Sequence, residues 1–183
     1  MGSDSIDLSL ENIWRSWHAF RKGKLAGAEH HEFQFNLEQN IAVLWGDLND
    51  GTYRHGGYKT FVVNDNKRRE ISVASVKDRV VHRLLYDYLN RIYDKTFIYD
   101  AWSCRLGKGL LGSIQRAQGL LKKHPQGFVW RADIKKFFDS VDQETLLKIL
   151  LLRIKDARTF GLLEAIIGSY ALDKSGGGSV VCL

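Results

Sequence analysis

Proline and cysteine are both scarce in this chain of 183 residues. Proline occurs once, at Pro125, so almost nothing in the sequence interrupts helices. The two cysteines, Cys104 and Cys182, lie far apart and do not make a disulfide framework, so we expect a reducing, cytoplasmic environment. No apolar run approaches the roughly 18 residues that are needed to cross a bilayer, and we therefore expect no membrane partner.

The composition is that of an ordinary globular protein with a basic balance. Hydrophobic residues make up 44% of the chain and charged residues 26%, whereas a disordered chain has fewer apolar residues. Lysine and arginine number 27 against 21 aspartate and glutamate, which gives a formal net charge of +6. Basic proteins of this size often bind nucleic acid, because each neutralised phosphate releases counterions. The same charge can serve solubility alone, and charge by itself does not decide between the two.

The spacing of apolar residues predicts an α+β fold with long helices and a small sheet. Helical spacing is strongest over residues 76–93, where Asp78 in the first turn suits the helix dipole and is expected to be mainly structural. Further helices are expected over residues 13–20, 36–48, 110–121 and 158–172, with one more that a capping box at residues 140–143 opens and that runs through Ile154. Residues 58–63 and 68–73 alternate around an Asn-Asp-Asn turn, which predicts a β-hairpin with basic residues at its tip.

Residues 128–133 are predicted to form a short strand that ends at Asp133. Side chains alternate along a strand, so Asp133 would share a side with Val129 and Arg131, away from Phe128. A carboxylate fixed at the end of a strand is well placed to hold Mg²⁺, which prefers one or two carboxylates together with phosphate oxygens. An aspartate that caps a helix or lies on the surface after a strand gives the same pattern, and that alternative stays open.

Three sequence blocks resemble motifs of prokaryotic reverse transcriptases of the retron, group II intron and diversity-generating retroelement kind. Residues 133–139, Asp-Ile-Lys-Lys-Phe-Phe-Asp, resemble the first palm motif of that family. Residues 68–82 resemble its fingers motif, and residues 97–109 resemble the block that follows. The blocks occur in the family's order and at about its spacing, and together they cover most of residues 58–152. The Tyr-Asp-x-x-x-Cys-Arg-x-Gly-Lys-Gly pattern favours the diversity-generating or an unclassified bacterial type.

The resemblance implies the front part of a right-hand polymerase, which extends a DNA primer on an RNA template. We expect mainly helical fingers with a β-hairpin over residues 1–126 and the first part of a palm over residues 127–183. The substrate would be a deoxynucleoside triphosphate (dNTP). The reaction would be two-metal phosphoryl transfer with Mg²⁺, or with Mn²⁺ in its place, so the family activity is that of a nucleotidyltransferase.

The resemblance also assigns roles to residues of the palm motif. Asp133 matches the catalytic aspartate that binds both metal ions, and Ile134 and Lys135 would offer backbone groups near the metal and the triphosphate. Phe138 matches the position whose ring stacks beneath the deoxyribose. The neighbouring Phe137 is explained equally well as a nucleotide contact or as a core residue.

Basic residues are the other contacts that the resemblance implies. Arg69 lies ten residues before Arg79, which is the offset of the family's arginine that grips the incoming triphosphate in a bidentate fork. Lys67 or Arg68 would be its companion cation, and a solvated strand face is the alternative for the two arginines. Contacts to the nucleic-acid backbone are expected from Arg79, Arg83, Arg105 and Lys108.

The sequence departs from the family's pattern after Asp133. It contains no Tyr-x-Asp-Asp hairpin, residues 174–183 only loosely resemble the family's next block, and the thumb is missing. One aspartate does not hold two Mg²⁺ ions, so we expect a truncated enzyme that is inactive alone. The incomplete palm would leave an unpaired strand edge, which favours a homo-oligomer. The alternatives are a non-catalytic RNA-binding module with the same fold and an unrelated basic helical interaction protein.

Overall fold

The computed structural model describes residues 5–23, 27–65, 68–135, 137–173 and 180–181. Two compact units make up the chain. The first unit joins Met1–Tyr88 to Lys136–Leu183, and the second unit is Leu89–Lys135. The expected boundary between fingers and palm, at residues 126 and 127, concerns polymerase subdomains and stays a prediction.

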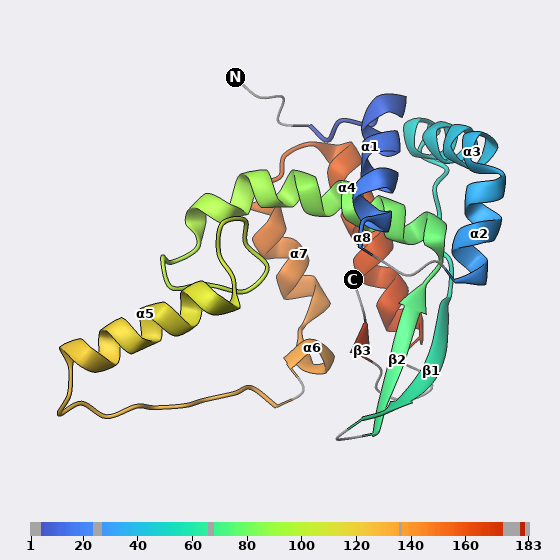
Figure 1. The fold of residues 1–183 in the computed structure, drawn as a ribbon. Helices are drawn as coiled ribbons and strands as arrows, with labels where there is room; N and C mark the ends of the chain where they lie inside the picture. The colour runs from blue at the N-terminus through green and yellow to red at the C-terminus, as the bar shows by residue number, and fades with distance from the viewer. Residues whose placement is uncertain (1–4, 24–26, 66–67, 136, 174–179, 182–183) are drawn as a thin grey trace. The chain divides into compact units, whose positions relative to one another are not determined.

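The architecture is α+β and mainly helical, as the apolar spacing predicts (Figure 1). The elements of the first unit are α1 (Leu10–Arg21), α2 (Ala28–Phe35), α3 (Leu37–Asp50), β1 (Tyr58–Asn64), β2 (Arg68–Ala74), most of α4 (Val76–Tyr93), α6 (Phe137–Ser140), α7 (Gln143–Leu151), α8 (Ala157–Asp173) and β3 (Val180–Val181). The second unit holds the end of α4, the short 3-10 helix η1 (Asp94–Thr96) and α5 (Leu110–Lys123). Among the described helices, none has the length and apolar character that crossing a membrane requires.

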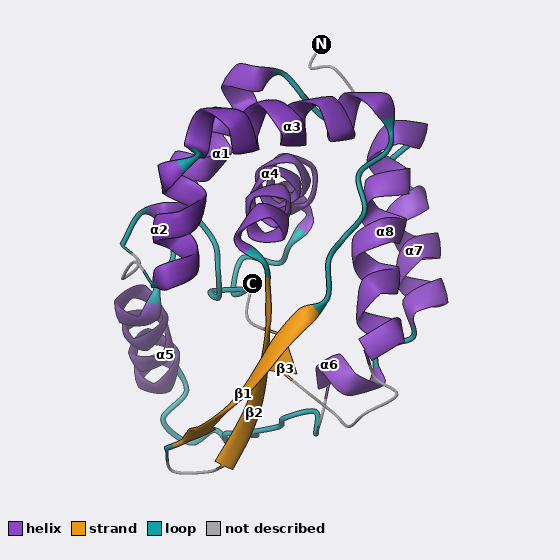
Figure 2. Ribbon diagram, turned by 90° about the vertical axis from the view of Figure 1, so that its right-hand side faces the viewer, coloured by secondary structure: helices purple, strands orange, loops and turns teal. Residues whose placement is uncertain are grey.

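Helix α4 carries the main apolar stripe of the first unit. Its residues Val80, Val81 and Leu84 are at most 2% exposed, because they recur at the helical spacing of three and four. Viewed nearly along the axis of α4, helix α3 lies above it, α1 lies above and to its left, and α7 and α8 lie to its right (Figure 2). Trp17 of α1 and Leu44 of α3 are also fully buried. Burying each such side chain stabilises the fold by about 1.5–3 kcal/mol, so this interior anchors the elements that carry the hairpin.

The predicted β-hairpin is formed by β1 and β2. The strands are antiparallel and pair Phe61 with Ile71 and Val63 with Arg69, while β3 runs parallel to the other edge of β2. Side chains alternate between the two faces of a strand, so Arg69 shares a face with Phe61 and Arg68 lies on the opposite face. The two adjacent arginines therefore point to different sides of the sheet.

The turn between β2 and α4 is closed by hydrogen bonds to the first turn of the helix. The backbone N–H of Asp78 donates to Ser75 Oγ at 3.2 Å, and the Ser75 hydroxyl donates to the Asp78 carboxylate at 2.6 Å. Glu29 of α2 accepts a further bond from the backbone N–H of Val76 at 2.9 Å. Two acidic side chains thus lie at the N-terminus of α4, where the helix dipole stabilises negative charge.

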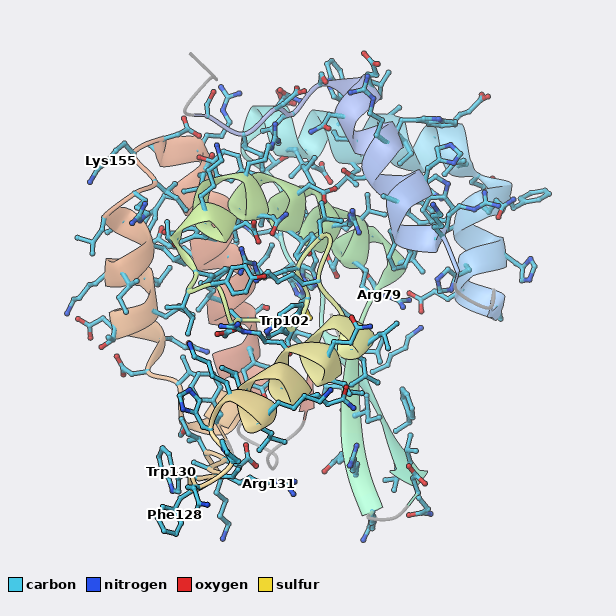
Figure 3. All side chains as sticks on the ribbon, turned by 60° about the vertical axis from the view of Figure 1, so that its left-hand side comes forward. Arg79, Trp102, Phe128, Trp130, Arg131 and Lys155 are labelled. Carbon is cyan, nitrogen blue, oxygen red and sulfur yellow. The ribbon has the colours of Figure 1, made fainter. Side chains whose placement is uncertain are left out.

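Residues 127–134 of the second unit form neither helix nor strand, so the prediction of a strand over residues 128–133 is wrong. A strand needs a neighbour to satisfy its backbone groups, and no described strand pairs with this segment. Phe128 is 104% exposed and Trp130 is 89% exposed, and both side chains project away from the chain (Figure 3). The alternation that suggested a strand is therefore not accompanied by burial of its apolar side chains.

Two smaller features also differ from expectation. Helix α2 is not evident from the sequence, because none of its residues is buried and it has no apolar stripe. The capping box expected at Ser140 is replaced by a cap at Asp142, whose carboxylate accepts a bond from the backbone N–H of Thr145 at 2.7 Å. A charged acceptor binds such an N–H more strongly than a hydroxyl does, so α7 begins directly after Asp142.

Candidate nucleic-acid interface

The hairpin presents Arg68 and Arg69 to solvent. Both side chains are exposed, and no ion pair joins either of them to another described residue. Lys59, on the same face as Arg69, pairs instead with Glu29 at 3.7 Å. Lys67 lies outside the described residues. Unpaired guanidinium groups suit phosphate binding, but a solvated strand face has the same appearance, so the nucleotide role of these residues stays a prediction.

The loop before the hairpin is fixed to α4 through the fully buried side chain of Asp78. The Tyr53 hydroxyl donates to Asp78 Oδ1 at 2.8 Å, and the Gly56 N–H donates to Oδ2 at 3.1 Å. A Cβ at Gly56 would come within 3.0 Å of that oxygen, so a side chain there would disturb the contact. Burial and the neighbouring carboxylate raise the pKa of Tyr53, which keeps its hydroxyl a donor. Asp78 therefore holds the base of the hairpin, in keeping with a structural role.

A stacked pair of histidines, His55 and His82, lies beside the hydrogen bonds that Asp78 makes with Tyr53 and Gly56, which we call the Asp78 clamp. Their Nε2 atoms are 3.0 Å apart, so one ring donates and the other accepts. Tyr58 stacks on His55 with ring centres 5.1 Å apart, and its hydroxyl lies 3.0 Å from Ser169 Oγ in α8. Burial and the nearby His55 lower the pKa of His82 to about 4, so this ring is neutral at pH 7. The sequence does not reveal the pair, because its members lie 27 residues apart.

Arg79 and Arg83, which were predicted to contact the nucleic-acid backbone, are both engaged within the first unit. The Arg79 guanidinium lies 5.1 Å from the ring centre of Phe20, and burial lowers the pKa of the guanidinium. Its Nε is buried and bonds to no described residue. Arg83 pairs with Asp87 at 2.9 Å and lies 5.3 Å from the ring centre of Tyr86. The backbone contacts of both arginines stay predictions.

In the second unit, Arg105 holds together the loop of residues 97–109. Its Nε lies 2.6 Å from Asp94 Oδ1, and a second bond joins Nη2 to Oδ2 at 3.3 Å. The guanidinium also donates to the carbonyl oxygens of Ile98 and Ala101 at 3.2 Å. The hydrogen bonds of this pair raise the pKa of Arg105 and lower the pKa of Asp94. Most donors of Arg105 are used within the second unit, on Asp94 and on the loop, and its predicted contact with nucleic acid stays a prediction.

Lys108 lies against two rings, Tyr99 and Trp102, which we call the aromatic corner. Its Nζ lies 3.9 Å from the ring centre of Tyr99 and 4.6 Å from that of Trp102, and it donates to the carbonyl oxygen of Tyr99. The two rings meet edge to face, with an interplanar angle of 85°. Trp102 packs on Gly112 of α5, where a Cβ would come within 2.7 Å of the indole. The sequence predicted a nucleic-acid contact for Lys108 but no role for Tyr99 or Trp102. The signal that could have found the two rings is the mixture of aromatic and basic residues in this block.

Arg116 of α5 borders the aromatic corner. Its guanidinium pairs with Asp100 through two bonds, Nε to Oδ1 at 2.9 Å and Nη2 to Oδ2 at 3.1 Å. The bidentate pair lowers the pKa of Asp100 and raises the pKa of Arg116. The guanidinium carbon also lies 5.4 Å from the ring centre of Tyr99. Two cations, Lys108 and Arg116, are thus held next to one tyrosine.

The net positive charge of the chain belongs to the second unit. Residues 89–135 contain nine Lys and Arg against three Asp, which accounts for the whole net charge of +6. The first unit contains 18 Lys and Arg against 18 Asp and Glu, so its formal net charge is zero. Such an asymmetry favours a polyanionic partner for the second unit, because phosphate contacts gain free energy from counterion release.

The palm-motif residues are divided between the two units. Asp133 is exposed on the irregular segment after α5, and Ile134 (66% exposed) and Lys135 follow it there. Phe137 begins α6 in the first unit, and the side chain of Phe138 lies outside the described residues. The carboxylate and the hairpin arginines therefore belong to separate units, and a shared site for them stays a prediction.

The described residues do not complete a magnesium site. No three His, Cys, Asp or Glu side chains among them gather closely enough to hold an ion. Asp133 offers one hard carboxylate oxygen, and the backbone carbonyl of Ile134 could add a second, whereas two Mg²⁺ ions need further carboxylates. The roles of Mg²⁺ or Mn²⁺ stay predictions.

Comparison with known proteins gives a distant relationship. No protein-family model matches the chain. The chain is 26% identical over 141 residues, 74% of its length, to group II intron-encoded protein LtrA of Lactococcus lactis subsp. cremoris, and equally to LtrA of strain MG1363. It spans 23% of the length of these curated relatives. The chain is therefore related, at this distance, to an intron-encoded protein of the reverse transcriptase kind, and its subtype stays a prediction.

Proposed function

We propose that this chain is the fingers and partial palm of an RNA-directed DNA polymerase, and that it binds RNA template, DNA primer and dNTP. The observation that carries the proposal is the match to an intron-encoded protein over 74% of the chain. Three blocks that resemble polymerase motifs, in the expected order, support the same family. The concentration of net positive charge in residues 89–135 supports the nucleic-acid partner.

In this proposal the exposed arginines of β2 bind the triphosphate of the incoming nucleotide. Arg69 meets two phosphate oxygens with its planar fork, and Arg68 or Lys67 adds a second cation. Asp133 contributes one carboxylate to the catalytic centre. Because the 183 residues contain no Tyr-x-Asp-Asp sequence, the remaining carboxylates are not supplied by these residues, and they do not extend a primer by themselves.

Nucleotide binding tests this proposal and separates it from the alternative. The chain would be mixed with a primer–template and titrated with a fluorescent dNTP. We expect Arg69→Ala to weaken dNTP binding roughly 10-fold to 100-fold, as loss of a charged hydrogen bond implies. Arg15→Ala is the matched control, because Arg15 is an exposed arginine of α1 whose ion-pair partner among the described residues is its helix neighbour Glu11. Equal dNTP binding by wild type and Arg69→Ala would contradict the nucleotide role of the hairpin.

The second candidate function is a non-catalytic RNA-binding module. The observation that favours it is the incomplete set of carboxylates around Asp133 among the described residues. It predicts RNA binding that depends on salt, together with no dNTP binding that responds to Arg69→Ala. Templated extension of a primer by the purified chain, in Mg²⁺ or Mn²⁺, would rule out this alternative and would also contradict our expectation that the chain is inactive alone.

We also propose that two copies of the chain associate through residues 127–134. Phe128 and Trp130 are almost fully solvent-exposed, and exposed apolar side chains of this size favour association. Sedimentation of the Trp130→Lys variant should then give a lower average mass than wild type at high concentration. Phe35→Lys, at a position that is 88% exposed in α2, serves as the control. An unchanged mass for Trp130→Lys would exclude this route of association.

A further inference from the structure

The aromatic corner has the properties of a platform rather than of a core. Tyr99 is 68% exposed, whereas Trp102 is held in place by its packing on Gly112 of α5. Figure 3 shows Trp102 beside α5, within the second unit. A large exposed ring beside a fixed one presents a rigid aromatic surface to solvent. Successive bases of single-stranded nucleic acid stack on such surfaces regardless of sequence, because every base has a π-face.

The cations at the corner differ in how firmly they are held. Arg116 is paired with Asp100 through two bonds, and Arg105 is paired with Asp94 in the same way. Lys108 makes no ion pair with a described residue; its ammonium rests on the two rings and on one carbonyl oxygen. Contacts of this kind at an exposed site are weak, and the long lysine side chain is flexible. Lys108 can therefore leave the rings when a stronger anionic partner arrives.

We propose that one base of a single-stranded nucleic acid stacks on Tyr99 at the aromatic corner, and that Lys108 moves from the rings to the adjoining phosphate. Arg116 stays on Asp100 and adds positive potential beside the same strand. The ligand exchanges a weak ammonium–ring contact for a base–ring contact and an ammonium–phosphate contact. This inference rests on the proposed nucleic-acid function and adds to it the place and the form of the bound strand.

The chemistry of the corner selects a single strand over a duplex. In a duplex the faces of the bases are covered by their neighbours, and only base edges and backbone are accessible. A stacking platform therefore offers a duplex nothing beyond charge. RNA template and DNA primer both have the required bases and phosphates, so the corner recognises a chemistry that the two share, and a comparison of the two tells which strand it holds.

Binding of short oligonucleotides to the full chain tests the inference. Oligo(U) and oligo(dT) of about ten nucleotides, within the site size of known single-strand binders, would be titrated at several salt concentrations. We expect Tyr99→Ala to weaken binding about 5-fold to 100-fold without changing the salt dependence, because it removes a stacking ring and no charge. Tyr99→Phe should bind as wild type does. Lys108→Gln should lower the salt slope by about 0.7, the value for one phosphate contact to a single strand.

A control variant and two contrary results separate this inference from the proposed function. Phe35→Ala removes an exposed ring from α2 in the first unit and should leave binding unchanged. Salt-dependent binding by wild type that Tyr99→Ala does not weaken would overturn the inference while leaving the proposed function intact. Binding of neither oligonucleotide by wild type would overturn both. The tighter of the two oligonucleotides identifies the strand that the corner holds.

Photo-crosslinking gives a second test that needs no substitution. Wild-type chain would be irradiated with an oligonucleotide that carries 5-iodouridine, which reacts with stacked aromatic rings, and then digested with trypsin. Cleavage after Lys95 and Arg105 releases residues 96–105 as one peptide, which contains both rings of the corner. We expect the crosslink in that peptide. Crosslinks confined to other peptides would overturn the inference, whatever the variants show.

Discussion

Buried polar side chains shape the surroundings of the hairpin more than its exposed charges do. Asp78 is fully buried and accepts bonds from Tyr53, Gly56 and Ser75. Its place in the first turn of a helix is readable from the sequence, since an acid there suits the dipole. Its tertiary partner Tyr53 is not, because no local pattern marks a residue 25 positions away.

Removal of the Asp78 carboxylate should destabilise the first unit. Asp78→Ala leaves the buried Tyr53 hydroxyl and the part-buried Gly56 N–H without their acceptor, so we expect the free energy of unfolding to fall by about 2–4 kcal/mol. Urea denaturation followed by circular dichroism measures this. Asp87→Ala is the control, because it removes a carboxylate of the same helix that is partly exposed, and it should cost less than about 1 kcal/mol. Equal losses of unfolding free energy in the two variants would mean that the Asp78 clamp does not stabilise the fold.

His82 should make stability depend on pH. Its folded-state pKa of about 4 lies below the ordinary value of 6.5, because burial and His55 disfavour the charged ring. Above pH 6.5 the ring is neutral in both states; between pH 6.5 and 4 only the unfolded state takes up the proton, so stability falls as pH falls. The full loss approaches about 3 kcal/mol. Unfolding of wild type and His82→Gln at pH 7 and pH 4.5 measures the difference, and an equal pH dependence in the two would contradict the assignment.

At the scale of elements, the spacing of apolar residues predicted the helices better than the strands, because helices form through local hydrogen bonds. The stripe of α4 is visible in the sequence, since a helix satisfies its own backbone and needs only an apolar face. The segment 128–133 alternates like a strand, but a strand depends on partners elsewhere, and the described residues provide none. Helix α2 was not predicted, for the opposite reason. It buries no residue, so its sequence shows no apolar residues at helical spacing. Once the hairpin was located, the alternation of side chains along β2 gave the face on which each residue lies.

The packing of α4 can be tested with a matched pair of leucines. Leu84 is 2% exposed in α4, and Leu152, directly after α7, is 74% exposed. We expect Leu84→Ala to lower the free energy of unfolding by about 2–5 kcal/mol, because it opens a cavity in the interior. Leu152→Ala should change it by no more than about 0.5 kcal/mol, as surface substitutions do. Comparable effects in chemical denaturation would show that α4 is not the centre of the first unit.

Across the whole molecule, charge and candidate chemistry are distributed unevenly. The second unit carries the net charge of +6 and the aromatic corner, while the first unit is neutral overall and carries the hairpin arginines. Composition gave the net charge of the chain but not which unit carries it, because that depends on where the chain divides into units. The predicted roles of Asp133 and Phe138 rest on the resemblance, since the carboxylate lies on an irregular segment and the ring lies outside the described residues.

The proposed function requires that residues 89–135 bind nucleic acid through phosphate contacts. Its most direct test is the salt dependence of single-stranded RNA binding by two matched double variants of the full chain. Lys122→Gln with Lys123→Gln removes two exposed charges from α5, and Lys148→Gln with Lys155→Gln removes two from the first unit. We expect the first pair to weaken binding and to reduce the salt slope by about 1.4, because each of the two lost phosphate contacts lowers it by roughly 0.7. The second pair should bind as wild type does, and equal effects of the two pairs would contradict binding through residues 89–135.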